Sequence, residues 1–413
     1  MRGPADIPEI VLLSFFPWDH EYPSTAHGLA RALARYTRVW FVSKPPTLRD
    51  AWRSRGRSDG DRARPSSRSI SGFAGRLRVV ELSPTLPINA LPEGRLYHAA
   101  RSRVDAKLNR ELGAVLRAGG CRECVAINLY NPTQFERLDL AGVRVRQRWY
   151  YTVDAIGEAR YTGRHGVAAE RRQLALSDGA LATGTRLGDD VRAFAKTLHV
   201  LPNAIDAATF LAGGTPPEPD DLAAVPRPRL AYLGNLDGAR LDFELVDGLA
   251  ADHPGVSFVL IGPWNADEAT RARLARHANV YLLGPKPPEA CAAYLHHADA
   301  GMIPFRSTAL TERIYPLKIN EYLACGLPVI ATPFSPDIGA FGDAIALEPR
   351  ERWSARLGRL LDDADIDEHS PERVRRRRAR AAANTWDHRA RRLLDLLGTP
   401  APAASGKIAS HAQ

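Results

Sequence analysis

The stretch from Tyr315 to Thr332 constrains the fold most, because it predicts a short helix with both ends marked, followed by a buried strand. Pro316 suits the first position of a helix, where its missing N–H would have no intrahelical partner. Gly326 suits the left-handed residue just past a helix end. The helix should therefore be about ten residues long. The apolar, β-branched run after it is typical of a strand in a parallel sheet covered on both faces.

Charged and apolar residues fall on different faces of this predicted helix. Ile319, Tyr322 and Leu323 follow the i, i+3, i+4 pattern of a buried face. Lys318 and Glu321, three residues apart, share another face. Lys318 lies in the first turn, where the free N–H groups and the helix dipole favour a nearby anion. The pattern predicts an anion site with a carboxylate beside it, and the alternative is a surface helix with a solvated ion pair.

Residues 316–332 resemble a known motif. Their pattern is Pro-x-Lys-x-x-Glu-Tyr-Leu-Ala-x-Gly-x-Pro-Val-x-Ala-Thr. It is the nucleotide-sugar motif of GT-B glycosyltransferases, especially family 4 and its teichuronic-acid-type bacterial members. The resemblance implies that Glu321 binds the ribose hydroxyls of the donor and that basic residues hold the diphosphate. Many members carry another glutamate eight residues earlier. This sequence has Arg313 there, and Glu312 is one residue out of register.

Length and composition favour two globular domains. A chain of 413 residues is too long for one ordinary core. Hydrophobic residues at 45% and charged residues at 25% are typical of a soluble protein. The 56 Lys and Arg exceed the 47 Asp and Glu by nine. This excess fits an anionic substrate or an acidic membrane surface better than nucleic acid, because no aromatic-rich basic motif accompanies it.

The expected location is cytoplasmic, since no stretch approaches the roughly 18 to 20 apolar residues of a membrane helix. We expect at most a peripheral contact with the inner face of the cell membrane. Two segments could touch anionic lipid, the arginine-rich residues 47–75 and the basic helical face 373–380. For both, a solvated surface is the alternative. Residues 47–75 are also predicted to be a long flexible insertion.

The alternation of strands and helices predicts an α/β fold of the GT-B type, with two facing Rossmann-like domains, parallel sheets and an interdomain cleft. The expected ranges are an N-terminal acceptor-side domain (1–210), a linker (211–228), a C-terminal nucleotide-sugar-binding domain (229–385), a helix that crosses back to the first domain (386–398) and a disordered tail (399–413).

Loops after the strands of the first domain carry the acceptor-side candidates. His20 lies in the loop after the strand 9–14, and His27 lies near the start of the next helix. Open α/β sheets bind ligands at such carboxyl-end loops. Asp154 follows the strand 148–153, where a carboxylate could orient or deprotonate an acceptor hydroxyl. The alternatives are solvated histidines and an aspartate that caps the next helix.

The loop after the strand 230–233 resembles the family's diphosphate-binding loop. Asn235 stands where the family has an arginine, and Arg240 falls at the expected lysine. Because one cation of two is retained, other basic residues should complete the site. The residues expected at the donor are Gly234, Asn235, Arg240, Lys286, Arg313, Lys318 and Glu321.

No cluster predicts a metal or redox centre. Cys121 and Cys124 form a Cys-x-x-Cys, but no second pair with zinc-ligand spacing follows. Asp-x-Asp spacings between Asp362 and Asp367 lie in a polar turn after a helix, whereas the metal site of the other large glycosyltransferase fold needs a strand end. We therefore expect metal-independent chemistry and no cofactor besides the nucleotide-sugar substrate.

Together these features predict the transfer of a sugar from a nucleotide diphosphate sugar to a saccharide or lipid-linked acceptor in cell-surface polysaccharide biosynthesis. The resemblance implies retention at the anomeric carbon. Catalytic roles are expected for Asp154, Arg240 and Lys318, since cations stabilise the leaving diphosphate. Two other classes stay open. One is a nucleotide-sugar epimerase, and the other is a non-catalytic partner that keeps the donor pocket.

Overall fold

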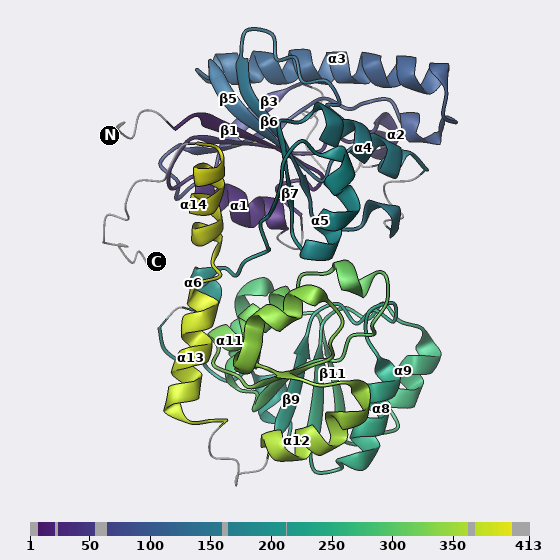
Figure 1. Ribbon diagram of the computed structural model, residues 1–413, viewed down its shortest axis with the longest axis vertical. Coiled ribbons are helices and arrows are strands. Elements are labelled where there is room, and N and C mark those ends of the chain that lie inside the picture. Colours follow the sequence, from purple (N-terminus) through teal and green to yellow (C-terminus); the bar gives the residue numbers. More distant parts are fainter. Residues whose placement is uncertain are drawn as a thin grey trace. The chain divides into compact units, whose positions relative to one another are not determined.

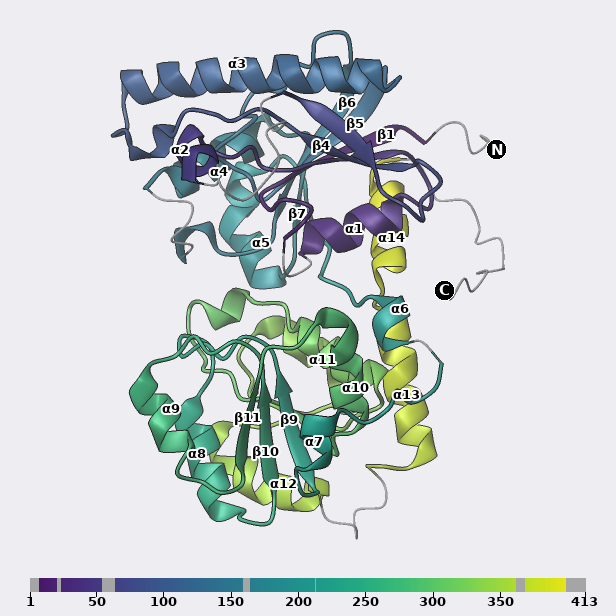
Figure 2. The same ribbon diagram turned by 180° about the vertical axis from the view of Figure 1, so that it is seen from behind.

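The computed structural model describes residues 7–20, 24–53, 64–158, 164–211, 213–361 and 368–398. Among these residues the strands form two separate sheets, one of eight strands and one of six. The chain divides into two compact units. Unit 1 consists of residues 1–151, 162–180 and 387–413, and unit 2 consists of residues 152–161 and 181–386. Figures 1 and 2 show both sheets with helices on their two faces.

The eight-stranded sheet has the order β3-β4-β2-β1-β5-β6-β7-β8. Strands β4, β2, β1, β5 and β6 pair in parallel along this order, whereas β3 is antiparallel to β4. Burial on both faces explains the apolar runs, since residues 10 to 13 of β1 are at most 2% exposed. The strands are β1 Glu9–Ser14, β2 Val39–Val42, β3 Ser66–Ser69, β4 Leu77–Glu81, β5 Glu123–Leu129, β6 Arg144–Thr152, β7 Gly179–Ala182 and β8 Leu198–Val200.

Helix α3, Arg95–Ala118, covers one face of this sheet (Figure 1). Leu108, Leu112 and Leu116 recur every four residues and are fully buried in a core shared with Trp40. The other helices of this part of the chain are α1 Thr25–Leu33, α2 Leu48–Arg53, α4 Gly166–Leu176 and α5 Thr185–Val191. The apolar periodicity alone therefore dictates how α3 packs.

The segment 47–75 differs from the flexible insertion that the sequence predicts. It contains helix α2 and strand β3, so the prediction is wrong for these parts, and residues 54–63 lie outside the described residues. Strand β3 is a polar edge strand whose Arg68 pairs with Asp19 at 2.7 Å. An edge strand that is largely solvated on both faces needs no apolar alternation, which is why its sequence resembles a loop.

The six-stranded sheet of unit 2 has the order β11-β10-β9-β12-β13-β14, and all its pairs are parallel. Its strands are β9 Arg229–Leu233, β10 Ser257–Ile261, β11 Val280–Gly284, β12 Ala300–Ile303, β13 Val329–Ala331 and β14 Ala346–Leu347. The helices of unit 2 beyond α5 are α6 Ala207–Phe210, α7 Asp220–Ala223, α8 Phe243–Asp252, α9 Glu268–Leu274, α10 Cys291–His296, α11 Leu317–Ala324, α12 Trp353–Leu361 and α13 Pro371–Ala382.

Helix α11 is the helix that the sequence predicts, but it is shorter and starts later. Pro316 is the N-cap and not the first helical residue, because its ψ of 67° is not helical. The helix has eight residues, and Gly326 follows it with a φ of +83°, as a left-handed helix end requires. Figure 2 shows α11 and α13 on the same side of the sheet. Because it has only eight residues, helix α11 offers a ligand about two helical turns.

The last described helix is α14 (Trp386–Leu396). Its Asp387 accepts a hydrogen bond from the Tyr36 hydroxyl at 2.8 Å, and Arg391 donates to the same hydroxyl at 2.7 Å. The expected disordered tail 399–413 and the Asp-x-Asp turn 362–367 lie outside the described residues. None of the helices in the described ranges is long and apolar enough to cross a membrane.

Candidate functional site

Three neighbouring strands of unit 2 end at glycines in the left-handed region. The φ angles are +152° at Gly234 after β9, +145° at Gly262 after β10 and +69° at Gly284, the last residue of β11. A Cβ on Gly262 would lie 1.8 Å from the Gly234 carbonyl oxygen, so only glycine allows this approach. The glycines form a floor of bare backbone at the carboxyl edge of the sheet, where parallel α/β sheets bind ligands. We call it the glycine floor.

The side chain of Lys318 lies directly on the glycine floor. A Cβ on Gly234 would lie 2.1 Å from Lys318 Cε, so the lysine occupies the space that a larger residue would need. Lys318 Nζ lies 4.0 Å from Glu321 Oε2, and the two side chains are 30% and 15% exposed. A cation and a carboxylate therefore stand side by side over the end of β9, and both remain open to solvent.

Tyr322 holds helix α11 in this position. Its hydroxyl accepts a hydrogen bond from the backbone N–H of Leu233, the last residue of β9, at 2.9 Å. Gly301 on β12 makes room for the ring, because a Cβ there would lie 2.5 Å from the Tyr322 ring. Tyr322 is fully buried. The position of the Lys318–Glu321 pair relative to Gly234 is thus fixed by a buried contact one residue away.

The Glu321 carboxylate carries unused hydrogen-bonding capacity. Burial raises its pKa, and the Lys318 ammonium opposes that shift. Within the described ranges, no donor reaches either carboxylate oxygen closely enough for a hydrogen bond. A largely buried carboxylate that the protein leaves unsatisfied is a candidate for ligand binding.

The loop after β9 places Arg240 near a carboxylate of the same loop. Arg240 Nε lies 3.7 Å from Asp237 Oδ2. At the start of the loop, Asn235 Oδ1 accepts a hydrogen bond from Asn265 at 2.6 Å. Asp154 is exposed, yet the protein around it desolvates the carboxyl and raises its pKa, an effect that Arg240 opposes. The structure thus couples Asp154 and Arg240 electrostatically.

Two other predicted donor residues are engaged by carboxylates of the protein. Lys286 Nζ lies 2.6 Å from Asp221 Oδ2, and this contact raises the lysine pKa. Arg313 Nε lies 2.5 Å from Asp190 Oδ2. A donor phosphate would have to compete with these carboxylates. Lys318 and Arg240 are therefore better placed to receive an anion than Lys286 and Arg313.

The two histidines of the acceptor-side prediction have different environments. His27 is buried, and its Nδ1 accepts a hydrogen bond from the backbone N–H of Ser24 at 3.0 Å. Its Nε2 lies 3.1 and 3.0 Å from the carbonyl oxygens of Pro17 and Trp18, to which it can only donate. Burial lowers the pKa of His27. His27 thus uses both nitrogens to hold its own loop, whereas His20 is exposed.

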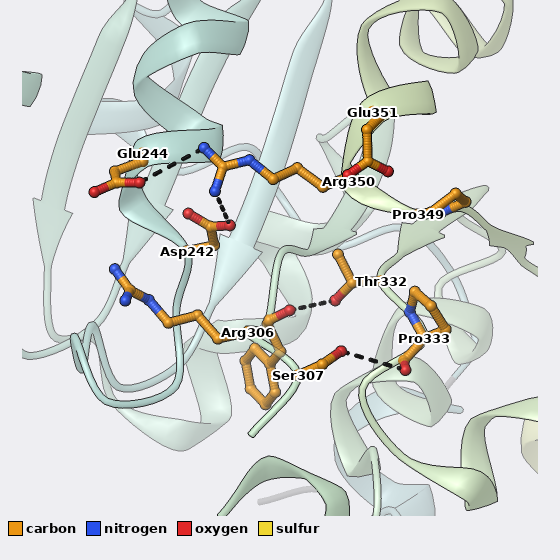
Figure 3. Close-up of a pocket in the computed structure, with 10 residues that line it drawn as sticks. Asp242, Glu244, Arg306, Ser307, Thr332, Pro333, Pro349, Arg350 and Glu351 are labelled. Atoms are coloured by element: carbon orange, nitrogen blue, oxygen red, sulfur yellow. Dashed lines mark hydrogen bonds and ion pairs between the residues drawn. The ribbon is translucent and has the colours of Figure 1, made fainter. Parts of the chain in front are cut away.

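A separate pocket of about 350 Å³ lies beside the carboxyl ends of β12, β13 and β14. Figure 3 shows that Arg350 pairs with two carboxylates of this pocket. Arg350 donates to Asp242 at 2.9 Å and lies 3.7 Å from Glu244. Thr332 donates to the Phe305 carbonyl at 2.5 Å. No residue predicted for the donor or acceptor lines this pocket, so we assign the candidate site to the glycine floor.

Cys121 and Cys124 are free, buried thiols. Across the described ranges, no group of three or more His, Cys, Asp or Glu side chains is arranged to hold a metal ion.

Sequence reasoning missed two residues that build the site, Gly262 and Gly301. A signal exists for Gly262, because this glycine follows an apolar run directly, as Gly234 does. Gly301 lies inside a strand, and a glycine there often marks the close approach of another group. In this structure that group is the Tyr322 ring.

Residues 227–363 match the family described as Glycosyl transferases group 1, so this part of unit 2 is a glycosyl transferase group 1 domain. Over 171 residues the chain is 27% identical to TuaH of Bacillus subtilis (strain 168), which carries the name of a teichuronic acid biosynthesis glycosyltransferase. The aligned stretch covers 40% of this chain and 43% of TuaH. The chain therefore matches less than half the length of this relative.

Solved structures match over nearly the whole chain. Sucrose-phosphate synthase from Thermosynechococcus elongatus has a TM-score of 0.66 and 17% identity, covering 95% of this chain and 98% of that one. Anabaena Alr3699/HepE, solved in complex with UDP and glucose, has a TM-score of 0.62 and 13% identity, with 95% and 99% covered. The chain thus has the GT-B fold, with two sheets of mostly parallel strands.

Proposed function

We propose that this chain is a glycosyltransferase that moves a sugar from a nucleotide diphosphate sugar to a saccharide or lipid-linked acceptor of a cell-surface polysaccharide. The observation that carries the proposal is the Lys318–Glu321 pair held over the glycine floor. The match of residues 227–363 to Glycosyl transferases group 1 supports it, and the name of TuaH supports the polysaccharide pathway.

The donor chemistry follows from the charges at the glycine floor. The diphosphate would lie beside Lys318 and the first turn of α11, where a cation and free N–H groups favour an anion. Negative charge grows on the diphosphate as the glycosidic bond breaks, so a fixed cation stabilises the transition state more than the ground state. Glu321 would accept hydrogen bonds from the ribose hydroxyls, as the motif implies.

Arg240 and Asp154 would act on the reacting end of the donor. Arg240 adds a second cation for the leaving diphosphate and interacts electrostatically with Asp154. A carboxyl whose pKa is raised exchanges protons more readily near neutral pH, which suits a group that orients or deprotonates an acceptor hydroxyl. With Lys318 and Arg240 as cations the reaction is proposed to be metal-independent, and the family motif favours retention.

We extend the proposal to peripheral binding at an anionic membrane surface through α13. Arg373, Arg376, Arg377 and Arg380 share one face of this helix and line a pocket of about 290 Å³ beside Phe341. Arg376 is 60% exposed and pairs with the exposed Asp343. Arg377 is buried and paired with Glu368, but Arg376 and Arg380 are exposed, and exposed arginines attract anionic headgroups at low salt.

Purified protein incubated with a panel of nucleotide sugars and saccharides tests the function, with products identified by mass spectrometry. Transfer predicts release of a nucleoside diphosphate and an acceptor heavier by one sugar residue. A changed sugar that stays on its nucleotide would instead identify an epimerase. Donor binding with no product from any pair would support a non-catalytic partner and contradict the proposal.

A further inference from the structure

The eight-stranded sheet has a topological switch point between β1 and β5. Strand β1 pairs in parallel with β2 on one side and with β5 on the other. The sheet then continues through β4 beyond β2 and through β6 beyond β5. Open α/β sheets bind ligands outside the carboxyl ends of the strands at such a reversal. Unit 1 thus has a candidate ligand position that does not depend on the glycine floor.

Three residues that follow neighbouring strand ends meet at this position. Phe15 follows β1 directly, Tyr130 follows β5 directly, and Lys44 follows β2 after one residue. The rings of Phe15 and Tyr130 contact edge to face, with centroids 6.2 Å apart. Lys44 Nζ lies 3.6 Å from the centroid of the Phe15 ring. We call these three residues the strand-end cluster.

A strained turn places Tyr130 in the strand-end cluster. Tyr130 has a φ of +56°, which side chains other than glycine rarely adopt. The Asn131 N–H donates to Asn128 Oδ1 at 2.9 Å, and Asn128 Nδ2 donates to the Asn131 carbonyl at 3.0 Å. These reciprocal bonds hold the turn in its unfavourable conformation. Such strain gathers at functional sites, where the surrounding structure enforces it.

Lys44 is a half-buried cation for which the protein provides no anion in contact. In the described part of the chain its ammonium forms no hydrogen bond and no ion pair, and it lies over the Phe15 ring. Burial lowers the pKa of Lys44 to about 8, and the more distant Asp50 opposes the shift. Asp50 itself accepts hydrogen bonds from Thr47. A desolvated ammonium without a counter-anion gains most from an anionic ligand.

We propose that the strand-end cluster binds the anionic group, a carboxylate or a phosphate, of a saccharide. Lys44 supplies the charge, and the partly exposed Phe15 ring, which packs against the buried Tyr130 ring, supplies an apolar surface of the kind that lines small-molecule sites. That the saccharide is the acceptor rests on the proposed function. The anion site itself stands on the geometry of unit 1. The acceptor of this chain is accordingly an acidic or phosphorylated sugar.

Binding of an anion should be coupled to the protonation of Lys44. A bound anion favours the charged ammonium and raises the pKa of Lys44 above its value of about 8 in the ligand-free protein. Affinity is therefore full below that value, where Lys44 is already protonated. It falls as the pH rises from there through the raised pKa of the complex.

Competitive acylation of the lysines tests the site directly, because the sequence has only six lysines and each can be followed by peptide mass spectrometry. At pH 7.5 an amine with a pKa near 8 is about one quarter neutral, against about 0.1% for an ordinary lysine. Lys44 should therefore be acetylated ahead of the exposed Lys196. Glucuronate and glucose 6-phosphate should slow this acetylation, whereas glucose should not. Protection by only one of the two acids identifies the group as carboxylate or phosphate.

Variants of Lys44 separate a binding site from a structural lysine. Lys44→Gln should weaken the binding of the anionic sugar that protects the parent protein. The affinity should fall by about ten-fold or more, as expected for the loss of a charged hydrogen bond. Lys44→Arg should retain it. Lys196→Gln removes an exposed charge as the matched control and should change nothing. Because Lys44 has no anionic partner to leave unpaired, the Gln variant should stay folded.

Titration with UDP keeps this proposal distinct from the donor site. All Lys44 and Lys196 variants should bind UDP as the parent does. If neither acidic sugar protects Lys44 better than glucose, or if Lys44→Gln binds the acidic sugar like the parent, the anion site is refuted. If the parent binds none of a panel of nucleoside diphosphates while the acidic sugar still protects Lys44, the proposed transfer reaction fails and the anion site remains.

Discussion

Replacing Glu321 with glutamine is the most direct test of the donor site, because it removes the charge and keeps the shape. The carboxylate is 15% exposed and forms no hydrogen bond with the described residues, so its acceptor capacity is left for a ligand. If it binds the ribose hydroxyls, the substitution removes charge-assisted bonds worth roughly 1.5 to 3 kcal/mol. UDP binding should then weaken by about ten- to a hundred-fold.

The fold should tolerate Glu321→Gln. Burial raises the pKa of Glu321 in the folded state, so the ionised carboxylate costs stability at pH values above its unfolded pKa. Neutral glutamine carries no such cost. The substitution loses only the pair with Lys318 at 4.0 Å, and a partly exposed pair of this kind is worth at most about 1 kcal/mol. The melting temperature should therefore stay close to that of the parent.

Calorimetric titration with UDP and 2′-deoxy-UDP makes the assay specific for the ribose contact. The parent should bind UDP more tightly than 2′-deoxy-UDP. Glu321→Gln should weaken the binding of both ligands and reduce the difference between their affinities. Glu312→Gln is the matched control, because Glu312 is an exposed glutamate in the 3-10 turn before α11. A folded Glu321→Gln protein with the parent's UDP affinity and the parent's preference for the ribose would refute the assignment.

Four further predictions follow from the same geometry. Lys318→Gln should lower turnover about ten-fold or more and reduce UDP affinity less. Steady-state UDP release measures the turnover and calorimetry measures the affinity. Equal losses in both would contradict a transition-state role. Gly234→Ala should lower turnover, because its Cβ would lie 2.1 Å from Lys318 Cε and displace the lysine; unchanged turnover would show that the lysine can move freely. Transfer should persist in excess EDTA, and a loss restored by magnesium or manganese would contradict metal independence. The protein should sediment with anionic vesicles at low salt and less so after Arg376→Glu; equal sedimentation with neutral vesicles would argue against α13 as a membrane surface.

The sequence places elements with a buried face with different accuracy, since β6 begins four residues before the predicted strand 148–153. Strand β1 occupies residues 9–14, as the sequence predicts. Strand β3 was missed because its four residues are three serines and one arginine, with no apolar face to detect. The start of α11 was placed too early, because Pro316 is compatible with both the N-cap and the first helical position.

In the candidate site, the sequence predicts contacts between neighbours on one helix but not contacts between distant residues. The nearness of Lys318 and Glu321 follows from their spacing of three on a helix. The partners of Lys286 and Arg313 are 65 and 123 residues away in sequence, so no local pattern could reveal that these cations are occupied. The unpaired state of Lys44 was equally invisible, since it depends on which carboxylates the fold brings near.

The contrast between charges that the protein satisfies with hydrogen bonds and charges that it does not supports the two proposed sites. Glu368 is a buried carboxylate that accepts hydrogen bonds from Arg356 at 2.8 Å and from the buried Arg377. Its charge is compensated within the protein, as a structural ion pair requires. Glu321 and Lys44 are also desolvated, but no described residue satisfies them with a hydrogen bond. Each follows or faces the carboxyl end of a parallel strand, where ligands bind. Their charges have opposite signs, so we expect hydroxyl donors at Glu321, whose nearest cation is Lys318 at 4.0 Å, and an anion at Lys44.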